Sequence, residues 1–212
     1  LSLMLNANCE FMSVGEIQKL NRQLNSYRRC SCGASSLWEC NFWRAVDDYV
    51  RWKSGKSLID LNMLDYSNAK DRFDDNQVLF EAIGSVSGKT FIVDSSKHPR
   101  RMAYLMRIRD LNVYPVYLIR TPEGQINSVL KKRGGLVKPI LSYELVNIQI
   151  RSRLRSVPHS VVHYEDLILK PEATLRIVLE PLGLRYDPKQ LRWAEFVAHD
   201  VAGNHMRLNK AS

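Results

Sequence analysis

The sequence has no apolar stretch near the roughly 20 residues of a membrane-spanning helix, and no secretory signal peptide is recognisable. It also lacks internal repeats, low-complexity tracts, linkers and any long run of basic residues. These absences favour one domain over residues 1–212, cytoplasmic and without a membrane span. At 45% hydrophobic residues, a chain of 212 residues is long enough to bury a sizeable core.

The charge balance is basic: 31 Lys and Arg residues stand against 22 Asp and Glu residues, for a net charge of +9. Such a balance favours an anionic partner, such as nucleic acid, membrane headgroups or a phosphorylated small molecule. Because the basic residues are scattered along the chain, we expect a nucleotide-sized anion and no nucleic acid as partner.

Cysteine is scarce, with four residues in the chain. Cys30 and Cys32 are separated by one residue and Cys40 follows eight residues later, which offers three metal ligands. The spacing fits the usual zinc patterns poorly, and no fourth ligand is near in the sequence, so we expect reduced thiols or one local disulfide and no metal. Metal binding is the less favoured alternative. Three histidines have no metal-binding spacing and are interpreted as structural: His98, His163 and His199.

Short runs of β-branched and aromatic residues predict four strands, at 11–14, 90–94, 113–119 and 161–164. Helical patterns fill the gaps between them. One example is an apolar stripe with helical spacing between Pro171 and Gly183: Leu175, Val178, Leu179 and Leu182. Strands that alternate with helices predict an α/β domain with three layers, α/β/α, and a central parallel sheet covered on both faces.

Each predicted strand ends at polar or charged residues. Glu16 follows the first strand, Lys97 the second and Arg120 the third, and Tyr164 ends the fourth. Because parallel strands end at the same edge of a sheet, we expect these four side chains to converge. A carboxylate, a lysine and an arginine around an anion site suit group transfer from a phosphorylated donor.

The third strand runs directly into a predicted helix that suits phosphate binding. Thr121 is a good N-cap and Pro122 suits the first helical position. Arg120, at the end of a strand that we expect to be buried, and Ser128, on the helix face, are placed to hold one anion, and Gly124 leaves it room.

At these junctions the chain resembles the sulfotransferases that use 3′-phosphoadenosine 5′-phosphosulfate (PAPS), in particular the bacterial type, with a more distant similarity to tyrosylprotein sulfotransferases. VDSSKHPRR is similar to the segment that presents a lysine to the sulfuryl group, and VYLIRTPEGQINS to the signature that holds the 3′-phosphate. VVHYEDLILKPEATLRIVLEPLGL resembles the Tyr-Glu-Asp-Leu strand and following helix, and VAGNHMR a loop that closes over the nucleotide. The segments span nearly the whole chain in the family's order, which implies a P-loop-like sulfotransferase fold.

The resemblance implies a role for each junction residue. Glu16 is the expected base and Lys97 the cation on the leaving oxygen, in a transfer that requires no metal. Five residues are expected to bind the donor: Arg120, Ser128, Tyr164, Asn204 and Arg207. Simpler interpretations stay open: a helix-start carboxylate for Glu16, a solvated lysine for Lys97, an internal salt bridge for Arg120 and a core-edge position for Tyr164.

Two departures from the family pattern stand out. Glu123 occupies a position where the family usually has arginine, and the Gly-rich loop that cradles the 5′-phosphosulfate is not found, so we expect the chain to begin just inside the domain. The acceptor is expected to be a small molecule, carbohydrate or peptide with a hydroxyl or amine. Alternatives are a nucleotide kinase, which would need a Walker-type Gly-Lys-Ser/Thr loop and magnesium ligands, a polyanion-binding module, and an inactive relative.

Overall fold

The computed structural model describes residues 1–63, 75–124, 137–203 and 208. The chain divides into two compact units: the first unit comprises Leu1–Leu111 and Asp187–Ser212, and the second unit comprises Asn112–Tyr186. Compact units can share one domain, so the single-domain organisation stays a prediction. Within the described ranges, no helix combines the length and the hydropathy that crossing a bilayer would require.

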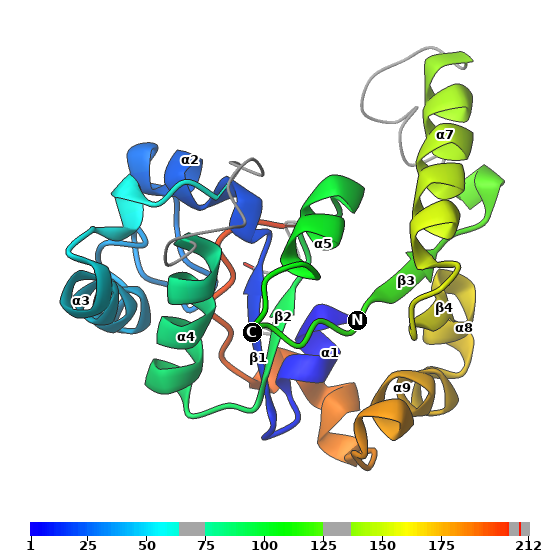
Figure 1. Ribbon diagram of the computed structural model, residues 1–212. Helices are drawn as coiled ribbons and strands as arrows, with labels where there is room; N and C mark the ends of the chain where they lie inside the picture. Colours follow the sequence, from blue (N-terminus) through cyan, green and yellow to red (C-terminus); the bar gives the residue numbers. More distant parts are fainter. Residues whose placement is uncertain (64–74, 125–136, 204–207, 209–212) are drawn as a thin grey trace. The chain divides into compact units, whose positions relative to one another are not determined.

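The first unit is built around a pair of strands, β1 (Phe11–Gly15) and β2 (Phe91–Asp94). Its helices are α1 (Ser2–Asn6), α2 (Leu20–Asn25), α3 (Asn41–Ser54), α4 (Asp75–Ser87) and α5 (Pro99–Leu105). Short 3-10 turns lie at η1 (Ile17–Lys19), η2 (Leu58–Asp60) and η4 (Pro188–Glu195). In Figure 1, α4 lies between α3 and the β1–β2 pair.

Strands β1 and β2 pair in parallel, with Phe11 opposite Phe91 and Ser13 opposite Val93. All five residues of β1 are buried, as expected for a parallel strand that is covered on both faces. The rings of Phe11 and Phe91 stack at 5.1 Å between centroids. The core around this pair is drawn from β1, η1 and helices α2 to α4: Val14, Ile17, Leu20, Trp43, Val46, Leu79 and Ile83.

The second unit contains the other strand pair, β3 (Val116–Ile119) and β4 (Ser160–His163), which is also parallel. Its helices are α7 (Val137–Leu154), α8 (Tyr164–Leu169) and α9 (Pro171–Leu179), followed by η3 (Glu180–Leu182). Helix α9 buries Leu175, Val178 and Leu179 and begins at Pro171, as its apolar stripe predicts.

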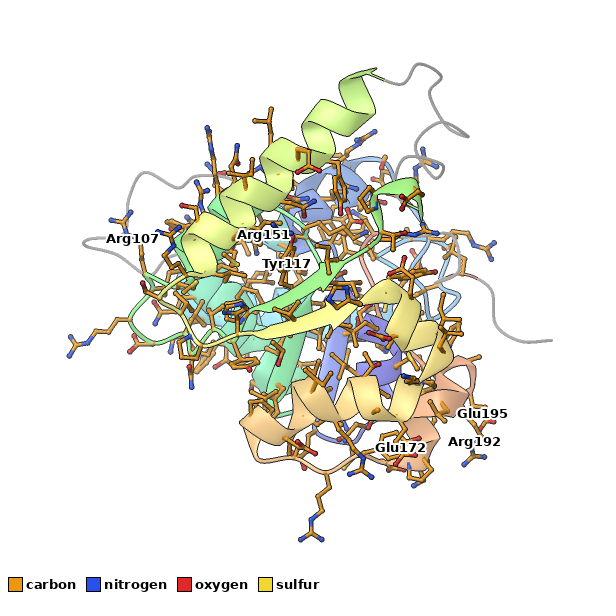
Figure 2. The ribbon with its side chains drawn as sticks, turned by 90° about the vertical axis from the view of Figure 1, so that its right-hand side faces the viewer. Arg107, Tyr117, Arg151, Glu172, Arg192 and Glu195 are labelled. Carbon is orange, nitrogen blue, oxygen red and sulfur yellow. The ribbon has the colours of Figure 1, made fainter. Side chains whose placement is uncertain are left out.

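The predicted α/β class and the parallel pairing are confirmed, and all four predicted strands are present. The strands form two parallel pairs, where the sequence suggested one central sheet. The third strand is less buried than expected, because its side chains alternate between two faces: Tyr117 is 8% exposed and Leu118 is 44% exposed. Figure 2 shows Tyr117 on β3 beside Arg151 of α7, and the Tyr117 hydroxyl donates to Asn147 of the same helix at 2.5 Å.

Candidate functional site

The carboxyl ends of β1 and β2 bring Glu16 and Lys97 together in the first unit. Lys97 Nζ lies 3.1 Å from Glu16 Oε1, and Lys19 pairs with the other carboxylate oxygen. The Glu16 side chain is 9% exposed, whereas that of Lys97 is 72% exposed. The predicted convergence of these two residues at a sheet edge is therefore present, with a buried carboxylate beside a solvent-facing ammonium.

The backbone is left-handed at both strand ends. Gly15 precedes Glu16 with a φ of 71°, and Lys97 itself has a φ of 57°. A side chain on Gly15 would collide with the backbone of Ala202, so only glycine fits there. At Lys97 this conformation costs about 1–2 kcal/mol, and it persists only because the surrounding structure holds it.

A network of buried polar groups holds the turn that carries Lys97. Asp94 Oδ1 accepts from the backbone N–H of Ser96 at 2.9 Å, and Asp94 Oδ2 accepts from Arg101 Nε at 2.9 Å. Arg101 is 1% exposed and also donates to Asn76 Oδ1 at 2.7 Å. The Ser96 hydroxyl in turn accepts from the backbone N–H of Gln18 at 3.1 Å, which ties this turn to the one after Glu16.

The charges around Glu16 keep it ionised. Burial raises the pKa of the Glu16 carboxyl, but the hydrogen bonds and charges of Lys19 and Lys97 outweigh burial and hold the pKa below its ordinary value. The group is therefore a carboxylate at neutral pH, which is the protonation state that a general base requires. If Lys97 left Glu16 to bind another anion, the carboxylate would lose one of its two cations. Its pKa would then rise, and Glu16 would become a stronger base.

The second unit has its own cluster at the carboxyl ends of β3 and β4. The guanidinium carbon of Arg120 lies 4.7 Å from the centre of the Tyr164 ring, a cation–π contact. Tyr164 begins α8 directly after β4, where the sequence placed it at the end of the strand. The hydroxyl of Tyr143 on α7 donates to the Arg120 carbonyl at 2.8 Å, which fixes the backbone there.

The predicted helix start after β3 is also present. Residues 122–124 are helical, and the Thr121 hydroxyl accepts from the backbone N–H of Gly124 at 3.3 Å, as an N-cap does. Glu165 Oε1 accepts from the Thr121 N–H at 3.1 Å and from its hydroxyl at 3.2 Å. These bonds, with the nearby charge of Arg120, lower the pKa of Glu165.

The side chain of Arg120 keeps one donor without a partner. Arg120 Nε is buried, and within the described part of the chain nothing accepts a hydrogen bond from it. A Cβ atom on Gly124 would lie 2.8 Å from this nitrogen, so the close approach depends on glycine. The sequence suggested that Gly124 leaves room for the anion, but the space beside it is taken by the Arg120 side chain. A buried guanidinium donor next to a helix start fits a phosphate oxygen, since such bonds are charge-assisted.

Three predicted donor-binding residues, Ser128, Asn204 and Arg207, lie outside the described residues. Sequence reasoning missed Asp94, Arg101 and Glu165 as supporting groups. Asp94 and Glu165 stand at strand ends and could have been found by the rule that identified the junction residues. Arg101 gave no signal, because nothing in a local pattern marks an arginine as buried.

The sequence contains two Gly-Lys-Ser/Thr tripeptides, at 55–57 and 88–90, which bear on the kinase alternative. Gly55 caps the end of α3, and Gly88 lies between α4 and β2. A Walker loop follows a strand and opens a helix, whereas both of these tripeptides follow a helix. Neither tripeptide therefore has the geometry that cradles nucleotide phosphates.

Comparison with solved structures finds a similar fold in two sulfotransferase domains. The sulfotransferase domain from the curacin biosynthetic pathway aligns with a TM-score of 0.54 at 16% identity, over 99% of this chain and 77% of that one. The sulfotransferase domain from the Synechococcus PCC 7002 olefin synthase aligns with a TM-score of 0.51 at 14% identity, over 100% of this chain and 74% of that one. This chain has the sulfotransferase fold. The resemblance seen in the sequence is thereby confirmed at the level of the fold, although no family model matches and no curated protein matches significantly.

Proposed function

We propose that the protein is a sulfotransferase that moves a sulfuryl group from PAPS to a hydroxyl or amine. The observation that carries this proposal is the buried, unpartnered Nε of Arg120 beside Gly124 and Tyr164. Arg120 would donate to the 3′-phosphate of the donor, and the Tyr164 ring, already in contact with the guanidinium, would hold it in place. The fold supports the same assignment, because open α/β sheets bind ligands at the carboxyl ends of their strands.

In this proposal Glu16 and Lys97 act on the reacting group. Glu16 takes the proton from the acceptor oxygen or nitrogen as that atom forms its bond to sulfur. Lys97 donates a hydrogen bond to the bridging oxygen as the sulfur–oxygen bond breaks. This hydrogen bond stabilises the negative charge that develops on that oxygen. The products are the sulfated acceptor and adenosine 3′,5′-bisphosphate. The step uses positioning and charge alone, by analogy with phosphoryl transfer.

The binding half of this proposal is tested with adenosine 3′,5′-bisphosphate and the full chain. Calorimetry or thermal shift should detect binding to the wild type, and AMP, which lacks the 3′-phosphate, should bind more weakly. Arg120→Ala should weaken bisphosphate binding by at least about tenfold, because a hydrogen bond to a charged group is lost.

Arg176→Ala is the matched control. Arg176 also contacts a tyrosine ring in the second unit, with its guanidinium carbon 5.4 Å from the centre of Tyr186, but it is exposed and pairs with Glu172 at 2.9 Å. It should leave the affinity within about twofold of wild type. A wild-type protein that shows no response to millimolar bisphosphate, or an Arg120→Ala variant with unchanged affinity, rejects the donor assignment.

A further inference from the structure

Three cysteines and a histidine gather in the first unit, and none of them belongs to the proposed sulfotransferase site. Cys30 and Cys32 lie in the loop that follows α2, and Cys40 is the residue before the first turn of α3. His199 comes from the segment after η4, more than 150 residues further along the chain. Their four ligand atoms, three Sγ and one imidazole nitrogen, all lie within 4.8 Å of one another.

The distances between these atoms fit a tetrahedral metal ion. Cys32 Sγ lies 3.6 Å from Cys40 Sγ, and His199 Nδ1 lies 3.2 Å from Cys40 Sγ and 3.9 Å from Cys30 Sγ. With zinc bonds of about 2.3 Å to sulfur and 2.0–2.1 Å to nitrogen, a tetrahedron separates two sulfurs by about 3.8 Å and a sulfur from a nitrogen by about 3.6 Å. The three measured distances lie within about 0.4 Å of these tetrahedral values, and all four atoms lie within 4.8 Å of one another, so only small shifts are needed to hold a zinc ion.

The protein around the cluster holds the histidine in place. The Ser31 hydroxyl donates to the carbonyl of Ala198 and accepts from the N–H of Asp200, both at 2.7 Å. It therefore fixes the backbone on each side of His199. Phe42 stacks on the imidazole at 4.7 Å between centroids, and Trp43 Nε1 donates to the His199 carbonyl at 2.8 Å. Outer contacts of this kind orient metal ligands and are typical of built sites.

Other interpretations of the cluster fit less well. All four cysteines of the chain are free thiols. A disulfide between any two of the three clustered cysteines would leave the third thiol and the imidazole nitrogen facing the disulfide bond. An iron–sulfur cluster distributes its ligands over several irons and so needs more widely spaced ligand atoms. Three soft thiolates and one imidazole in a tight tetrahedron select Zn²⁺.

We propose that Cys30, Cys32, Cys40 and His199 bind one structural zinc ion. Because four protein ligands complete the tetrahedron, no position is left for a substrate or a reactive water, and the ion has no part in sulfuryl transfer. It would crosslink the loop between α2 and α3 to the segment after η4. That segment continues directly to β1, where Val201 N–H donates to the Val14 carbonyl at 2.9 Å and Glu16 N–H to the Ala202 carbonyl at 3.0 Å. The zinc ion would thus fix the backbone next to the proposed base.

The test is the metal content of the full chain, produced in zinc-supplemented medium and purified without chelators or a histidine tag. Mass spectrometry of the metal should find about one zinc per chain. Cobalt added to the apoprotein should give the thiolate charge-transfer and strong visible bands of a tetrahedral site. Cys32→Ser and His199→Gln, whose side chains are only partly buried, should bind zinc at least about tenfold more weakly.

Two variants serve as matched controls. Cys9→Ser removes the exposed cysteine and His163→Gln an exposed histidine, and both should keep one zinc per chain. Zinc below about one tenth of an equivalent in the wild type, together with no cobalt bands, overturns the proposal even if the ligand variants fail to fold. The proposal is also overturned if, without reductant, the intact protein mass is lower than that of the reduced chain by two hydrogen atoms, because this loss indicates a disulfide. Bisphosphate binding is measured in a separate experiment, so the zinc proposal and the sulfotransferase proposal can each fail without the other.

Discussion

Replacing Gly124 with alanine tests the phosphate site through a single added methyl group. The new Cβ would lie 2.8 Å from Arg120 Nε, and ordinary contact begins at 3.4 Å, so the guanidinium must retreat by about 0.6 Å. A shift of that size removes one good hydrogen bond to a charged group, which contributes about 1.5–3 kcal/mol. The affinity for adenosine 3′,5′-bisphosphate should therefore fall by about 10- to 150-fold.

Stability should change little, which separates this effect from damage to the fold. Gly124 is the third residue of a helical turn, where alanine is favoured over glycine by about 0.5–1 kcal/mol. This gain offsets the cost of moving Arg120 Nε and Thr121 Oγ1, which the new Cβ would approach at 2.8 and 3.0 Å. Gly84→Ala in α4 is the matched control, because its Cβ would find only Ile92 at 3.9 Å, and it should leave affinity unchanged. Calorimetric titration and urea unfolding of both variants measure the two quantities. Wild-type affinity in folded Gly124→Ala would refute the proposed contact between Arg120 and the ligand.

Three further predictions concern the first unit. Glu16→Gln should lower kcat by about 10²–10⁴-fold with bisphosphate affinity kept, and turnover within a few-fold of wild type would exclude the base role. Because the folded-state pKa of Glu16 is lowered, the carboxylate stabilises the fold fully above pH 4.5, and this stabilisation is lost as the pH falls through the folded-state pKa. The melting temperatures of wild type and Glu16→Gln should therefore differ at pH 7 and converge in acid, and a gap that stays constant would contradict this. Arg101→Met should lower the free energy of unfolding in urea by about 3–5 kcal/mol, since Asp94 is left with an unpaired charge, and a loss below about 1 kcal/mol would show that the pair is well solvated.

The local parts of the fold could be predicted from the sequence because their causes are local. The β-branched and aromatic runs locate all four strands, and the Thr-Pro pair after β3 locates the helix start with its Thr121 cap. The pairing of Glu16 with Lys97, and of Arg120 with Tyr164, follows from one rule: parallel strands that are neighbours end at the same edge.

The parts that could not be predicted depend on contacts between distant segments. His199 stands beside Cys40 because the chain returns to β1 after η4, and no periodicity near residue 199 announces that return. The spacing of Cys30, Cys32 and Cys40 alone offered three possible ligands and argued against a metal. The structure adds a fourth possible ligand, His199, from the far end of the chain. Arg101 is similar, because its burial depends on Asp94 and Asn76 from other elements.

The two clusters assign binding and chemistry to different residues, which makes the sulfotransferase proposal separable by kinetics. In this proposal Arg120 contacts only a phosphate that does not react, and Gly124 acts through Arg120, so variants of both residues should change donor KM and bisphosphate Kd by the same factor. In the same proposal Glu16 and Lys97 act where bonds change, so their variants should lower kcat and leave bisphosphate Kd nearly intact. A Glu16→Gln, Gly124→Ala double variant should then show the product of both effects. If Glu16→Gln instead weakened bisphosphate binding as much as Arg120→Ala does, Glu16 would be a structural support of the donor site, and the base would have to be sought elsewhere.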